Sequence, residues 1–94
     1  MIIVAGSLTV DPADRDRYLE EVRAVTVAAR SAGGNVDFHQ AADPIEPDRI
    51  NVFEAWETVE AVEAFRGDGP TGDVAPAIRD ADVRQYEIAS VTQL

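Results

Sequence analysis

The sequence of 94 residues contains no cysteine, which excludes disulfides, thiolate metal sites and a cysteine nucleophile. It contains one histidine, so a single chain lacks the several imidazoles of a multi-histidine metal centre. No segment approaches the ~18 uninterrupted apolar residues of a membrane span. The N-terminal residues also lack the basic stretch and long apolar run of a secretory signal. These absences predict a soluble, cytoplasmic protein without a metal site.

Basic residues are also few: 8 lysines and arginines stand against 18 acidic residues, for a formal net charge of −10. This negative net charge repels nucleic acid and anionic membranes, so neither is an expected partner. The acidic residues are spread along the chain, which favours a role in solubility. The length predicts one domain, 1–94, and a chain this short gains core by self-association.

Apolar spacing and turn residues divide the chain into alternating strands and helices. Asp11-Pro12 supplies an N-cap and a proline at the first helical position. Tyr18, Val22 and Val25 then form one apolar stripe of a helix, which Gly33-Gly34 ends. The same reasoning predicts strands at 2–10, 35–42, 49–57 and 82–92, and helices at 12–32, 58–66 and 73–81.

The strand at 49–57 carries large apolar side chains on both faces, so both faces are expected to be covered. Glu54 and Trp56 share one of these faces, because strand side chains alternate. A carboxylate among apolar residues is costly unless it is paired or protonated. We therefore expect Glu54 to pair with Arg66 or Arg84. The alternative is that Glu54 holds a cation or accepts a hydrogen bond from a substrate hydroxyl.

The order of elements is β-α-β-β-α-(α)-β. With right-handed crossovers, this order predicts an α+β fold: a ferredoxin-like split βαβ arrangement with a four-stranded antiparallel sheet. Its helices lie on one side of the sheet, yet Val52 or Phe53 must point to the other side. A second copy of the chain, packed sheet against sheet, would cover that face, so we expect a homodimer.

The chain resembles the antibiotic biosynthesis monooxygenase family of dimeric α+β barrels over nearly its whole length. The resemblance is carried by Met1–Val10, by Asp11-Pro12 opening the first helix, by Asn-Val-Phe-Glu-Ala-Trp-Glu at 51–57, and by Glu-Ala-Val-Glu-Ala-Phe at 60–65. It implies a dimer with a pocket between sheet and helices. It also implies oxygenation of phenolic or quinol-like substrates without metal, flavin or other cofactor.

Two departures from the family argue against haem degradation. Relatives that degrade haem use a histidine in the helix after the tryptophan as iron ligand, and here that segment is Ala64-Phe65-Arg66. They also use an asparagine in the first strand, where this chain has Ala5-Gly6-Ser7.

His39 is the candidate catalytic base, because it is the only side chain whose unperturbed pKa lies near neutrality. It would take the proton of a phenol or quinol and leave an anion that reacts with oxygen. The alternative is a surface histidine beside Asp37. A metal site through Asp37, His39 and Glu54 fails on geometry, since Glu54 is expected on another face.

Other residues are candidates for substrate binding. Trp56 and Tyr86 would form pocket walls, although both also fit as core residues. Arg66 or Arg84 would hold an oxyanion, and Asn51 is a weaker polar candidate. Residues 67–72 match G-x-G-x-x-G, but the motif follows a helix instead of a strand, so we interpret it as a loop.

The leading hypothesis is a homodimeric, cofactor-independent monooxygenase-like enzyme that oxidises a small aromatic phenol or quinol. The alternatives are a non-enzymatic dimeric module, either ligand-binding or structural, and an isomerase or cyclase on the same scaffold. The space around Trp56 separates the first two. A solvent-connected cavity of several hundred Å³ favours ligand binding, whereas close packing favours a structural role.

Overall fold

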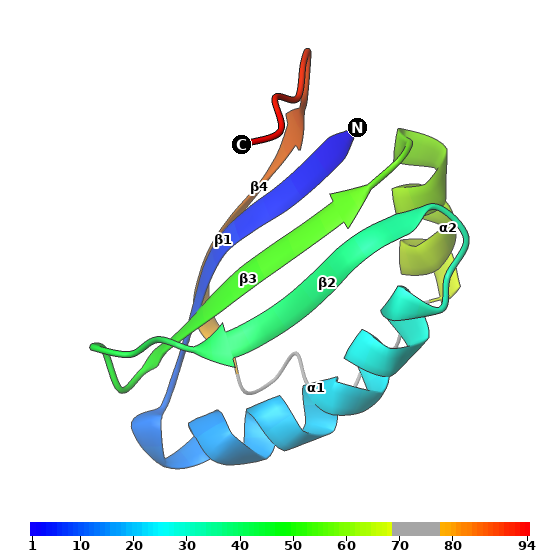
Figure 1. The fold of residues 1–94 in the computed structure, drawn as a ribbon. Coiled ribbons are helices and arrows are strands. Elements are labelled where there is room, and N and C mark those ends of the chain that lie inside the picture. Colours follow the sequence, from blue (N-terminus) through cyan, green and yellow to red (C-terminus); the bar gives the residue numbers. More distant parts are fainter. Residues whose placement is uncertain (69–77) are drawn as a thin grey trace.

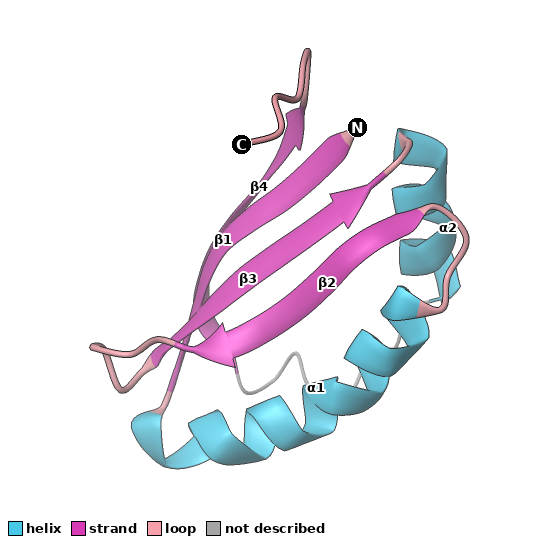
Figure 2. Ribbon diagram, in the orientation of Figure 1, coloured by secondary structure: helices cyan, strands magenta, loops and turns pink. Residues whose placement is uncertain are grey.

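The computed structural model describes residues 1–68 and 78–94. The described chain forms an antiparallel sheet with its α-helices on one side (Figures 1 and 2). The elements are strand β1 (Ile2–Val10), a 3-10 turn (Pro12–Asp14), helix α1 (Arg15–Arg30), strands β2 (Asn35–Ala42) and β3 (Arg49–Trp56), helix α2 (Val59–Asp68) and strand β4 (Ile78–Glu87).

The sheet has four strands in the order β2-β3-β1-β4, and each neighbouring pair is antiparallel. The first and third strands are central, and the connections through α1 and α2 cross over the same side (Figure 1). This is the split βαβ arrangement of the ferredoxin-like α+β fold, and it confirms the predicted fold class. The bounds of β1 and β2 also match the prediction, and β3 ends one residue earlier than predicted.

The core lies between the sheet and the two helices. Alternate residues of the strands face it, because strand side chains point to opposite sides in turn. The largest fully buried side chains are Trp56, Ile50, Val10 and Val62. The opposite side of the sheet has no helix over it in the described residues, and we call it the open face.

The predicted helix at 73–81 is wrong over 78–81, where the chain is already in β4; residues 73–77 lie outside the described part. Ile78 pairs with Val10 and Ala81 with Leu8, so sheet pairing overrides a short helical spacing of apolar residues. The predicted end at 92 is wrong too. Glu87 pairs with Ile2, at the start of β1, and beyond it only Ile88 N–H reaches Met1 O, at 2.9 Å.

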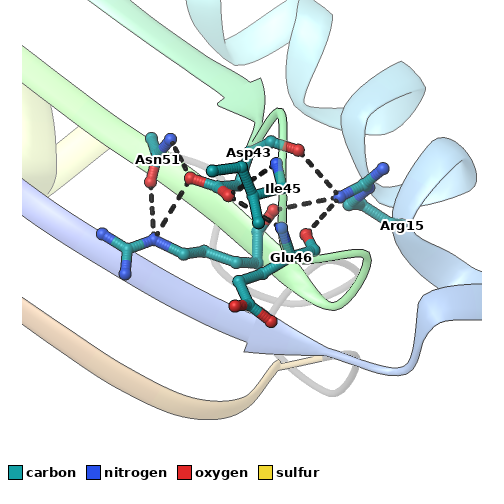
Figure 3. A network of polar contacts seen from close by, with 6 residues as sticks. Arg15, Asp43, Ile45, Glu46 and Asn51 are labelled. Atoms are coloured by element: carbon teal, nitrogen blue, oxygen red, sulfur yellow. Dashed lines mark hydrogen bonds and ion pairs between the residues drawn. The ribbon is translucent and has the colours of Figure 1, made fainter.

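The connection between β2 and β3 is held by the Asp43 carboxylate (Figure 3). It accepts hydrogen bonds from the backbone N–H groups of Ile45 and Glu46, at 3.0 and 2.9 Å, and from Asn51 Nδ2 at 2.9 Å. Arg15, at the start of α1, donates to the Glu46 carbonyl at 2.8 Å. These contacts tie the hairpin loop to the first helix and fix how β2 pairs with β3.

These hydrogen bonds, chiefly that from the Glu46 backbone, lower the pKa of Asp43 from 3.8 to about 2. Because the pKa is lower in the folded state, the stabilisation is present above the ordinary value of 3.8 and is lost as the pH falls toward 2. Asp43→Asn is therefore expected to lower stability at neutral pH and to flatten the loss of stability between about pH 4 and pH 2. Urea unfolding at several pH values measures both effects.

Asp48→Asn is the matched control, because it changes a carboxylate of the same loop that contributes none of these bonds in the described residues. Equal acid dependence of the Asp43 variant and the unaltered protein would show that this carboxylate does not stabilise the loop.

Candidate functional site

Four of the six candidate site residues lie on the open face. Directly paired residues of neighbouring strands share a face. His39 pairs with Phe53, Phe53 with Ala5, and Ala5 with Arg84, so these residues form one row across the sheet. Tyr86 and Asn51 lie in the adjacent rows, where they pair with Ile3 and Ser7. The structure therefore brings His39, Asn51, Arg84 and Tyr86 to one side.

His39 is held on two sides. Its ring stacks on Phe53, with centroids 5.3 Å apart and planes at 23°. Its Nδ1 lies 3.5 Å from Asp37 Oδ2, and Oδ1 of the same carboxylate accepts from Phe38 N–H at 2.8 Å. A carboxylate beside Nδ1 favours a proton on that nitrogen and leaves Nε2 as the acceptor. The side chain is 47% exposed, so a ligand can reach the imidazole ring.

The other open-face candidates differ in how firmly they are held. Asn51 donates to Asp43 Oδ1 and accepts from Arg49 Nε at 2.8 Å, which commits both ends of its amide to the loop network. Arg84 Nε lies 3.1 Å from Asp82 Oδ1, and both side chains are exposed. Tyr86 is 46% exposed. Arg84, at the far end of the row that begins at His39, and Tyr86, in the adjacent row, are therefore both accessible to a ligand on the open face.

Trp56 lies on the opposite side, facing the helices, and is fully buried. Its ring centroid is 5.3 Å from that of Phe65, and its Nε1 donates to Glu54 Oε1 at 3.0 Å. As placed, the indole offers no open surface to a ligand. This close packing around Trp56 is what we expect of a tryptophan with a structural role.

The expected pairing of Glu54 with an arginine is wrong. Arg84 lies on the open face, and Arg66 Nη1 donates to Gln85 Oε1 at 3.1 Å. The indole is the partner of Glu54 instead, because residues two apart on a strand point the same way. Glu54 also faces away from Asp37 and His39, as expected. In residues 1–68 and 78–94, no three acidic or histidine side chains group as metal ligands.

A pocket of about 470 Å³ lies at the start of α2, near the start of β1 and the end of β4. Its lining includes Ile2, Thr58, Gln85 and Glu87, and none of the six candidate residues. A cavity of the expected size is thus present on the helix side, but it lies beside the N-terminus of α2 and not around Trp56. Within the described chain, no helix has the length and apolar character needed to cross a membrane.

Two contacts of the candidate residues escaped prediction from the sequence. Phe53 stacks on His39, and the indole of Trp56 bonds to Glu54. The bond between Trp56 and Glu54 could be predicted from their i, i+2 spacing on one strand. The stacking of His39 on Phe53 could not, because it depends on the register between β2 and β3. Gly67 and Asp68, the first two residues of the glycine-rich motif at 67–72, are the last residues of α2, so the interpretation as a loop is wrong there. Residues 69–72 lie outside the described part, and for them it stays a prediction.

The geometry defines a small ferredoxin-like α+β domain with a helix-covered face and an open face. The family model described as antibiotic biosynthesis monooxygenase matches residues 1–74. The chain therefore belongs to the antibiotic biosynthesis monooxygenase family, which confirms the resemblance. A search of curated proteins finds no match.

Solved structures with the same fold cover nearly the whole chain. One is a protein of Nitrosomonas europaea named as an antibiotic biosynthesis monooxygenase, with TM-score 0.80, 16% identity, and coverage of 96% of this chain and 100% of that one. A protein of Deinococcus radiodurans with the same description has TM-score 0.75, 18% identity, and coverage of 100% and 98%. At these identities the likeness shows the shared fold.

A third structure is the heme-degrader MhuD of Mycobacterium tuberculosis, with two hemes bound in its active site. It has TM-score 0.71, 15% identity, and coverage of 99% of this chain and 100% of that one. The residues of this chain do not fit a haem between sheet and helices. Phe65 packs against Trp56 and Phe38 there, and the one histidine, His39, lies on the open face.

Proposed function

We propose that the protein is a homodimeric, cofactor-independent monooxygenase-like enzyme that oxidises a small phenol or quinol, with His39 as its base. Family membership supports oxygen chemistry. The single observation that carries the assignment of the base is the arrangement of His39 between the Asp37 carboxylate and the Phe53 ring. It leaves a half-exposed imidazole beside an aromatic ring.

The reaction begins when Nε2 of His39 takes the hydroxyl proton of a phenol that lies against Phe53. The phenolate is electron-rich and reacts with oxygen. A phenol with a free para C–H then gives a para-quinone and one water: one oxygen atom enters the ring, and the other leaves as water. The substrate supplies all four electrons, so the reaction consumes no external reductant. General-base catalysis of the first step contributes roughly 10²–10⁴-fold.

Tyr86 and Arg84 lie across the open face from His39 and would contact the far side of the substrate. Arg84 would hold a developing oxyanion in place of Asp82. On the helix side, Arg66 holds Gln85 of β4 and Trp56 anchors the end of β3. In this proposal these two residues support the sheet instead of touching the substrate.

The proposed dimer covers the open face and removes water from the base. Tyr86 is 46% exposed there, and Ile3 and Phe53 lie in the same region of the sheet. Tyr86→Glu is expected to give a monomer at micromolar concentration, because it places a charge in the interface. Sedimentation velocity measures the change.

Val27→Glu is the matched control, because it makes the same apolar-to-charged change at an exposed position of α1. It should leave the dimer intact. A monomeric unaltered protein, or equal dissociation by the two variants, would show that the open face is not the interface.

The reaction itself is tested by mixing protein with a panel of phenols and quinols without oxygen and then admitting oxygen. The proposal expects oxygen uptake above the buffer control for at least one compound, in protein treated with a metal chelator. Uptake equal to the control across a broad panel would refute it.

The pocket of about 470 Å³ at the start of α2 favours a second candidate, a small-ligand-binding module without catalysis. This candidate expects saturable binding of a phenol by calorimetry, with no oxygen uptake and with equal affinity after His39→Gln. The same two measurements therefore distinguish the enzyme from the binding module.

A further inference from the structure

The carboxylate of Glu54 lies in an unusual setting on the helix-facing side of β3. It is flanked in the sheet by Phe38 and Val4, which are 3% and 2% exposed, and Trp56 follows on the same face. The Glu54 side chain itself is partly exposed. A carboxylate that is partly removed from water costs free energy unless a donor or a cation compensates it.

The protein supplies only part of that compensation. Oε1 of Glu54 accepts the indole N–H of Trp56, a neutral donor, at 3.0 Å. The chain has arginines but no lysine, and no arginine of the described residues contacts this carboxylate. Arg66, on the neighbouring helix, instead donates to Gln85. An ionised carboxylate accepts about four hydrogen bonds, so Glu54 retains acceptor positions for a ligand that reaches its exposed side.

Aromatic rings surround the same group. Phe65 of α2 packs against Trp56 with centroids 5.3 Å apart, and against Phe38 with centroids 6.0 Å apart. Phe38 and Trp56 are both sheet neighbours of Glu54, so Phe65 lies over the same patch, and it is only partly buried. A carboxylate beside aromatic rings is the environment that binds an ammonium group, through charge and through the faces of the rings. The net charge of −10 also draws cations to the protein.

We propose that Glu54, with Phe65 and Phe38 beside it, binds a small organic cation: a protonated primary amine with an apolar body. The ammonium donates to the free oxygen of Glu54, and the apolar body lies against the partly exposed ring of Phe65, which packs on the buried ring of Phe38. Trp56 positions the carboxylate through its N–H. This site goes beyond the proposed oxidation, since it faces the helices and His39 faces the other way.

The probe is 2-phenylethylammonium, and 2-phenylethanol is its neutral counterpart of nearly the same shape. Binding is measured by calorimetry and by the emission of Trp56, the only tryptophan in the chain, which reports directly on its hydrogen-bonded partner. Glu54→Gln keeps the volume and an acceptor for the indole but removes the charge. Glu63→Gln, at an exposed position of α2, removes the same charge elsewhere and is the matched control.

The proposal expects saturable binding of the ammonium with a change in Trp56 emission. It expects affinity at least about tenfold weaker for Glu54→Gln and for the alcohol, the size of a lost charge-assisted hydrogen bond. Glu63→Gln should bind as the unaltered protein does. Absence of saturable binding, equal binding of the alcohol, or equal weakening by both variants would overturn the site. The comparison of amine with alcohol needs no variant, so it decides the question even if Glu54→Gln fails to fold.

Discussion

Replacement of Gly6 by alanine is expected to destabilise the protein by about 3 kcal/mol, because the change adds a clash to a strained backbone position. Gly6 has φ +155°, a value that residues with a side chain rarely adopt. A Cβ atom there would lie 1.9 Å from the carbonyl oxygen of Asp82 and 2.8 Å from Cα of Val83. Both obstacles are backbone atoms of β4, so relief requires β1 and β4 to separate. Urea unfolding followed by circular dichroism measures the effect.

Gly33→Ala is the control for this prediction. A Cβ atom at Gly33 meets nothing within 4 Å, and the residue lies in the turn after α1. Its free energy of unfolding should change by less than about 1 kcal/mol. If the two variants have the same stability, the close approach of β1 to β4 at Gly6 does not exist in solution.

Replacement of His39 by glutamine is expected to lower the rate of phenol oxidation by roughly 10²–10⁴-fold, the usual contribution of a general base. Glutamine is polar and of similar length but does not take up a proton near neutral pH. Asp37→Asn should give a smaller loss, because it removes the charge beside Nδ1 and leaves the imidazole in place. Initial rates of oxygen uptake measure both effects.

Arg23→Gln, an exposed change on α1, should leave the rate unaltered. An active His39→Gln variant would remove His39 as the base but would leave the reaction class untouched. Each variant must keep the dimer mass and the circular dichroism spectrum of the unaltered protein. A lower rate of oxygen uptake then reflects the chemical step and not unfolding.

Local signals in the sequence were sufficient for most of the fold. The proline after Asp11 and the apolar stripe of α1 define the first crossover, and the β-branched and other apolar residues at 2–10 define β1. The start of β4 could not be predicted in this way, because Ile78 and Ala81 also satisfy helical spacing. Their pairing with Val10 and Leu8 is a long-range contact that no local pattern reveals.

The arrangement of the candidate site was harder to predict for a related reason. Alternation places His39 and Trp56 within their own strands, but it does not say which residues of β2 and β3 lie side by side. The loop that Asp43 holds sets that register. The register puts His39 beside Phe53, on the face of the sheet that Trp56 does not share. A pocket that combines His39 with Trp56 is therefore not possible within one chain, although the residue types alone suggested it.

The most direct test of the proposed function is oxygen-isotope labelling with a phenol that has a free para position and that supports oxygen uptake. Under oxygen-18 gas in ordinary water, the proposed reaction gives a para-quinone that carries one heavy oxygen atom, with water as the other product and no hydrogen peroxide. The label should be absent when the same compound is incubated without protein or with His39→Gln. Quinone without the label, or peroxide formed in equal amount to the quinone, would contradict a monooxygenase reaction.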